Sequence, residues 1–183
     1  MLLYLLHSYV LTPPDKFFQN NLQAYKVYQS NNATKKIAIG INVQSEPLND
    51  LAVRTAILKA LDPWDYMDIV WNGTGSSNIG IPIYSPNYGI SETELRTEYS
   101  AKPGQARELI KDLPTDIPSE ISLTVADFDD DQLQLALRIS EDLTDVGFNI
   151  ETRAIHPSQY WEQLLNPLKT YQLILGSLPP IQT

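Results

Sequence analysis

The feature that most constrains the fold is a regular alternation of strand and helix patterns after residue 120. Three short apolar segments, residues 121–126, 148–154 and 171–175, have the composition of buried strands. A segment with helical spacing separates each from the next. Strands that alternate with helices in this way form a parallel sheet with right-handed crossovers. The sequence therefore predicts an α/β layer in this part of the chain.

The two helices predicted between these strands have recognisable ends. An aspartate among residues 129–131 caps the first helix, and Gly147 ends it. The second helix is short, spans residues 157–165, and follows His156, which can cap or flank it. The apolar stripe of the first helix consists of Leu135, Ile139, Leu143 and Val146.

Strand patterns also occur near the start of the chain. Residues 1–10 read as a buried strand, because they have neither the basic start and cleavage site of a signal peptide nor the length of a membrane span. Residues 25–29 and 36–44 read as two further strands, joined by a polar turn at residues 30–32.

Helices and a long loop follow these strands. The apolar spacing from Val53 to Leu61 predicts a helix capped by Asn49 or Asp50. A second helix begins at Asp62 and Pro63 and ends at Gly73, with Trp64, Met67 and Trp71 on one face. Residues 73–91 are predicted to form a loop, which at this length is often functional. A helix over residues 102–113 is then expected, capped by Ser100 with Pro103 near its first turn.

Composition and motifs exclude several classes of function. The net charge of -9 argues against nucleic-acid binding by this segment, and the absence of cysteine excludes disulfides and thiolate metal sites. No catalytic or phosphate-binding motif occurs, so the sequence predicts neither an enzyme nor a cofactor. The two histidines, His7 and His156, read as structural, and residues 129–131 read as a helix start and not as a calcium site.

A set of polar and aromatic side chains near predicted element ends forms the candidate ligand-binding site. Ligand clefts commonly combine aromatic walls with a few hydrogen-bonding groups. The alternative, in which the tryptophan fills the core and the others are solvated loop residues, is equally consistent with the sequence. The candidates are Asn42, Trp71, Asn72, Thr74, Ser76, Asn78 and Tyr84.

Several segments, in order, resemble the extracellular solute-binding proteins of the oligopeptide, dipeptide and nickel class. Residues 49–57 resemble the family helix with the pattern D-x-x-V-R-x-A, and the strand before it holds Asn42, as in the family. Asp62 and Pro63 lead to a Gly-Thr-Gly loop at residues 73–75, and residues 143–151 resemble a helix end followed by a strand. Tyr99, residues 106–110 and Tyr160 complete the resemblance.

The resemblance implies an α/β chain that forms one lobe of a type II periplasmic-binding-protein-like fold. In that fold two lobes close on the ligand by hinge motion. Residues 1–183 are then a single lobe, the second, and a fragment of a longer two-lobed protein, since both ends look cut. One departure concerns the segment after residues 171–175. The family has a tryptophan and an acidic residue there that often contact the ligand amino group, whereas this chain has Leu178, Pro179 and Pro180.

The function that the resemblance implies is solute binding for uptake by an ABC transporter, with an oligopeptide as the expected ligand. Opine-like compounds, oligosaccharides and chelated nickel are alternatives within the family. The expected partner is the transporter permease, reached through the full-length protein. The expected location is extracellular or periplasmic, with a lipid anchor on a preceding N-terminal segment and no membrane span in this one. The alternative function is the ligand-sensing domain of a transcriptional regulator.

Overall fold

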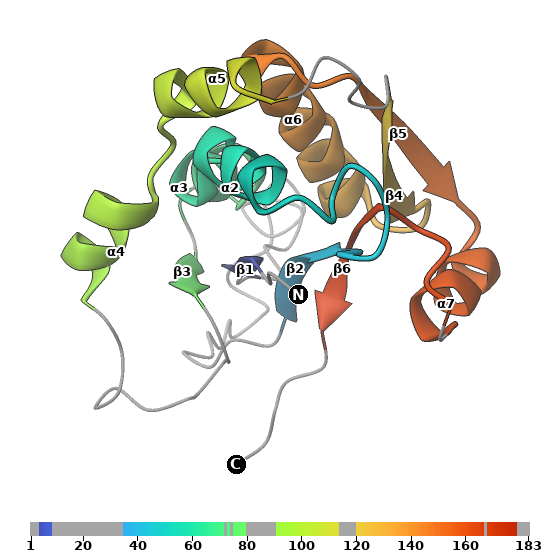
Figure 1. Ribbon diagram of the computed structural model, residues 1–183. Helices are drawn as coiled ribbons and strands as arrows, with labels where there is room; N and C mark the ends of the chain where they lie inside the picture. Colours follow the sequence, from blue (N-terminus) through green and yellow to red (C-terminus); the bar gives the residue numbers. More distant parts are fainter. Residues whose placement is uncertain are drawn as a thin grey trace, which may run out of the picture.

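The computed structural model describes residues 4–8, 35–71, 73, 75–79, 91–113, 120–166 and 168–178. Within them, one six-stranded sheet with the order β3-β1-β2-β6-β4-β5 runs through the molecule, and Figure 1 shows helices on both of its faces. The strands are β1 (Tyr4–Ser8), β2 (Lys35–Ile41), β3 (Gly75–Ile79), β4 (Ile121–Ala126), β5 (Ile150–Ile155) and β6 (Leu173–Leu178). The helices are α2 (Leu51–Ala60), α3 (Pro63–Trp71), α4 (Glu92–Tyr99), α5 (Pro103–Lys111), α6 (Asp130–Val146) and α7 (Pro157–Leu165).

The parallel sheet predicted for the second half of the chain is confirmed. β4 pairs in parallel with β5 on one side and with β6 on the other. The intervening helix α6 has Asp129 as its cap, whose side chain accepts a hydrogen bond from the Gln132 amide. Gly147 ends this helix in the left-handed region, with φ of 115°, where glycine avoids the steric cost of a side chain. The local sequence thus sets both ends of α6.

The first half of the chain adds three antiparallel strands to this sheet. β1 lies where a buried strand was predicted, and it pairs with β2 and with β3. β3 corrects the prediction of an unbroken loop over residues 73–91, because Gly75–Ile79 is a strand. Its sequence, Gly-Ser-Ser-Asn-Ile, has low strand propensity, so main-chain pairing with β1 accounts for it. The predicted strand at residues 25–29 and turn at 30–32 lie outside the described residues.

The helices α2 and α3 have the predicted caps. The Asp50 carboxylate accepts a hydrogen bond from the Ala52 amide at 2.7 Å, and the Asp62 carboxylate accepts one from the Trp64 amide at 3.0 Å. α4 was not predicted, although Ser91 and Glu94 form a capping box at its start. Its existence corrects the role expected of Ser100, which ends α4 and does not cap α5.

The two faces of the sheet bury different side chains. On one face, α2, α3, α5 and α6 cover the main hydrophobic core, which includes the fully buried Ile37, Leu123 and Leu173. On the other face, α7 contributes Tyr160 to a smaller cluster with Ala126, Tyr171 and Ile174. Figure 1 shows α7 apart from the other helices, at the right.

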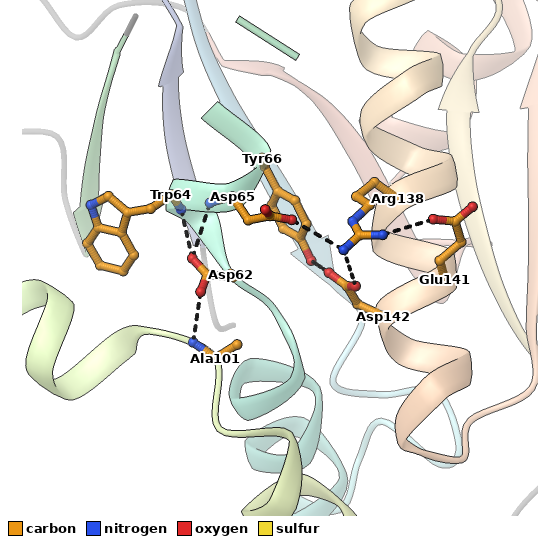
Figure 2. A network of polar contacts seen from close by, with 8 residues as sticks. All are labelled: Asp62, Trp64, Asp65, Tyr66, Ala101, Arg138, Glu141 and Asp142. Carbon is orange, nitrogen blue, oxygen red and sulfur yellow. Dashed lines mark hydrogen bonds and ion pairs between the residues drawn. The ribbon is translucent and has the colours of Figure 1, made fainter. Parts of the chain in front are cut away.

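Polar contacts join α3 to α6 on the outer side of the main core (Figure 2). The Tyr66 hydroxyl donates a hydrogen bond to Asp142 at 2.6 Å. The Arg138 guanidinium forms ion pairs with Asp65 at 3.3 Å and with Asp142 at 3.4 Å. Burial raises the pKa of the Asp142 carboxyl, although the Tyr66 hydrogen bond and the Arg138 charge oppose this shift.

None of the helices in the described part of the chain has both the length and the apolar composition needed to cross a bilayer.

Candidate ligand-binding site

A crevice site is expected at the edge of the sheet where β4, β5 and β6 have their carboxyl ends. β4 continues into α6 on the main-core face, and β5 continues into α7 on the opposite face. In open α/β sheets, ligands bind outside the carboxyl ends of strands at the point where neighbouring connections leave on opposite faces. The topology therefore places the candidate ligand-binding site at this edge, which we term the carboxyl edge.

The turn between β4 and α6 supplies polar and apolar groups to the carboxyl edge. Phe128 is 59% exposed there, although it is a large apolar side chain. Gln132 is 2% exposed, and its amide nitrogen donates to Asp129 at 2.8 Å and to the Ser177 hydroxyl at 3.2 Å. The start of α6 is therefore fixed to the end of β6, beside a solvent-facing aromatic ring.

The last residues of β6 extend beyond the end of β4. Pairing between these strands stops at Leu175 opposite Val125, whereas pairing of β6 with β2 continues to Leu178. In the described part of the chain, the side of Ser177 and Leu178 that faces away from β2 has no partner strand. Main-chain groups at such a strand edge can pair with an added extended chain.

Trp71 is the last residue of α3, whereas Ser76 and Asn78 lie in β3, at the end of the sheet beyond β1. The Trp71 indole is 5% exposed, and its nitrogen donates to Asp131 near the start of α6 at 3.1 Å. In β3, Ser76 lies opposite His7 and Asn78 lies opposite Leu5 in the pairing with β1. Asn72, Thr74 and Tyr84 lie outside the described residues.

Asn42 lies at the opposite edge of the sheet. It follows β2, and its main-chain amide donates to the Gln172 carbonyl just before β6 begins. Its side chain is 6% exposed and donates to the carbonyls of Lys169 at 2.8 Å and Tyr171 at 3.0 Å. The structure thus separates Asn42 from the start of β3, and gives its amide a role in joining β2 to β6.

The sequence analysis missed three groups at the carboxyl edge, namely Phe128, Gln132 and Ser177. The predicted strand ended at residue 175, but β6 continues through Gly176 to Leu178. An aromatic residue directly after a predicted strand and before a helix cap is a pattern that could have indicated Phe128.

A separate pocket of about 310 Å³ lies on the outer side of the helices, lined among others by Asp62, Arg107, Arg138, Asp142 and Asp145. Its polar groups already join helices: Asp62 caps α3, Arg107 donates to the Asp145 carbonyl, and Arg138 pairs with Asp142. The described part of the chain holds no group of three His, Cys, Asp or Glu side chains placed to bind a metal ion. The carboxyl edge therefore remains the candidate site.

A family model described as bacterial extracellular solute-binding proteins, family 5 Middle, matches residues 7–179. The chain belongs to this family. The match confirms the predicted family. This family consists of extracellular or periplasmic binding proteins and not of enzymes. No curated protein matches the chain in sequence.

Solved structures of solute-binding proteins share the fold. NikZ from Campylobacter jejuni, in complex with Ni(L-His), has a TM-score of 0.72 at 14% identity over 92% of this chain and 34% of its own. A periplasmic oligopeptide-binding protein from Thermotoga maritima, bound to mannohexaose, has a TM-score of 0.68 at 19% identity, covering 91% and 34%. AppA from Bacillus subtilis, an oligopeptide-binding protein in complex with a nonapeptide, has a TM-score of 0.64 at 18% identity, covering 78% and 30%.

These likenesses confirm the predicted fold class, an α/β fold of the type II periplasmic-binding-protein kind. The chain spans about a third of the length of these solved structures, between 30% and 34%. The family and the solved structures give no support to the alternative of a transcriptional regulator.

Proposed function

We propose that this family 5 chain acts as one lobe of a two-lobed receptor that captures oligopeptides for uptake by an ABC transporter. The observation that carries the proposal is the end of β6, where Ser177 and Leu178 run on beyond β4 at the carboxyl edge. An extended peptide placed there can pair its main chain with that of β6, whatever its side chains. Such pairing favours a broad range of peptide sequences.

The surroundings of β6 suit an added peptide strand. The Phe128 ring, 59% exposed in the turn between β4 and α6, offers an apolar surface for ligand side chains. The hydrogen bond from Gln132 to Ser177 joins the start of α6 to the end of β6. Trp71, Ser76 and Asn78, with Asn72, Thr74 and Tyr84, remain candidates for ligand contacts in this proposal, whereas the Asn42 side chain already contacts two carbonyl groups. The other lobe of the full-length protein supplies the other wall, and hinge closure encloses the ligand.

Peptide is favoured over the other ligand classes because its main chain repeats donors and acceptors at the spacing of a strand. An oligosaccharide or a metal chelate has no such repeat and does not need the end of a strand. The related oligopeptide-binding protein from Bacillus subtilis is in complex with a nonapeptide. In this proposal the protein acts outside the cytoplasmic membrane, anchored by lipid, and delivers its ligand to a permease.

The test is mass spectrometry of the small molecules released when the purified full-length protein is denatured. A set of short peptides with varied sequences and a narrow range of lengths is the expected result. A single sugar or a metal chelate as the released species would overturn the peptide assignment. A sequence-restricted peptide would overturn the main-chain mode of recognition while it keeps the ligand class.

A further inference from the structure

The Tyr160 hydroxyl is a polar group at the tip of a largely buried side chain, and the fold alone does not explain its role. Tyr160 lies on α7 and is 4% exposed, within the small cluster under β4 and β6. Burial, with a smaller contribution from Tyr171, raises the pKa of the Tyr160 phenol to about 12. No hydrogen bond to this hydroxyl is found within the described residues. Tyr160 therefore keeps its proton at neutral pH and can donate a hydrogen bond.

The position of the hydroxyl is set by a close approach to β6. A Cβ atom at position 176 would overlap the Tyr160 hydroxyl, so the phenol can stand there only because Gly176 has no side chain. Gly176 is the first residue of β6 beyond the end of pairing with β4 at Leu175. The glycine thus places the phenol beside the open end of β6, at the carboxyl edge.

The hydroxyl itself is not fully buried. Among the described residues, the fully buried side-chain polar atoms without a hydrogen bond are Trp64 Nε1, Arg138 Nε and Thr152 Oγ1. The Tyr160 hydroxyl can therefore exchange water for a ligand oxygen. The Tyr160 ring itself is anchored by packing against Ala126 and Ile174 and by an edge-to-face contact with Trp161, with ring centroids 5.6 Å apart.

We propose that the Tyr160 hydroxyl is a specificity-determining group that donates a hydrogen bond to an oxygen atom of the ligand lying beside Gly176. The inference rests on the proposed function, because it takes the end of β6 as the ligand site. It assigns α7 to recognition, on the face of the sheet opposite to α6. Ligands with a carbonyl or carboxylate oxygen at this position bind more tightly than analogues without one.

The test compares Tyr160→Phe with the wild-type protein, and Tyr171→Phe is the matched control. Tyr171 is also buried on this face, 6% exposed, but its hydroxyl lies near Gly40, away from the end of β6. Calorimetric titration of the full-length protein with a panel of unmodified alanine peptides, two to six residues long, gives the dissociation constants. Loss of one neutral hydrogen bond weakens binding by roughly three- to tenfold.

The expected result is this loss for Tyr160→Phe alone, with a melting temperature close to that of the wild type. Equal affinity of Tyr160→Phe and wild type for every peptide that binds would overturn the inference and leave the proposed function intact. The same loss in Tyr171→Phe would also overturn it, since the effect would then be a general one of this face. Failure of the wild type to bind any peptide would overturn the proposed function, and the inference with it.

Discussion

The two faces of the central sheet differ in the size of the side chains that they present. Toward α2, α3 and α6, the strands place large apolar residues, among them Ile39, Val125 and Leu175. Toward α7, the same strands place small residues next to Ile174, namely Ala38, Gly40, Ser122, Thr124, Ala126 and Gly176. The first face binds its helices through apolar burial, whereas the second lets the aromatic rings of Tyr160 and Tyr171 approach the strand backbone.

This difference indicates that one face of the sheet mainly stabilises the fold, whereas the other face mainly positions groups near the carboxyl edge. Large interlocking side chains stabilise the fold, and their energetic contribution grows with the apolar area that they bury. Small side chains contribute less, but they leave main chain and phenol groups close together near the carboxyl edge. Substitutions on the two faces are therefore expected to differ in what they change.

The largest expected effect is on the main-core face. Leu135 of α6 is fully buried there, so Leu135→Ala removes packing and leaves a cavity, with an expected loss of about 2–5 kcal/mol in the free energy of unfolding. Urea denaturation followed by circular dichroism measures it. Leu137→Ala on the same helix is the control, because Leu137 is 59% exposed, and a change within about 0.5 kcal/mol is expected. Similar losses in both variants would contradict the assignment of the core face.

The next effect is on the α7 face. Gly176→Ala forces a methyl group into the space of the Tyr160 hydroxyl, with an expected loss of about 1–3 kcal/mol in the free energy of unfolding. The loss is expected to be smaller in the Tyr160→Phe background, since one of the overlapping atoms is removed. A double-mutant cycle measures this coupling.

The control for the glycine is Gly104→Ala on α5, where an added Cβ meets no atom within 4 Å. Unchanged or slightly higher stability is expected there, because alanine favours helix more than glycine does. If Gly176→Ala also leaves the stability unchanged, the phenol is not held against β6 and the close approach is wrong.

The smallest effect concerns the contacts between α3 and α6. Burial raises the pKa of the Asp142 carboxyl in the folded protein, so the folded state binds its proton more tightly than the unfolded state. The contribution of this group to stability is therefore favourable at low pH and is lost as pH rises through the folded pKa. Asp142→Asn removes this dependence. Denaturation curves between pH 4 and pH 7 should show the variant gaining stability relative to wild type as pH rises, and a parallel pair of curves would refute the shift.

Elements with strong local patterns were predictable from the sequence. α6 has an apolar stripe, an aspartate cap and a terminal glycine, and its observed span of Asp130–Val146 follows from them. α4 had a capping box at Ser91 but no apolar stripe, so nothing indicated that it would pack. β3 depends on its pairing with β1, which a window of residues does not contain.

The candidate site was less predictable because it depends on the order of the strands. Asn42 was placed at a strand end, and it lies there, but the sequence did not indicate which edge of the sheet that end would occupy. The antiparallel pairing of β2 with β6 places it at the edge where β6 begins. Tyr160 and Gly176 are 16 positions apart in the sequence, and only the crossover between α7 and β6 brings them together.

The position of β6 in the sheet has a consequence for how the chain is made. It lies between β2 and β4 and is the one described strand that joins the antiparallel half of the sheet to the parallel half. It is also the last of the six strands to leave the ribosome. Until β6 is synthesised, the nascent chain has two incomplete half-sheets, each with an edge strand whose main-chain groups are unpaired and prone to aggregation. The two halves of the sheet therefore become one folded unit only when residues 173–178 pair between β2 and β4.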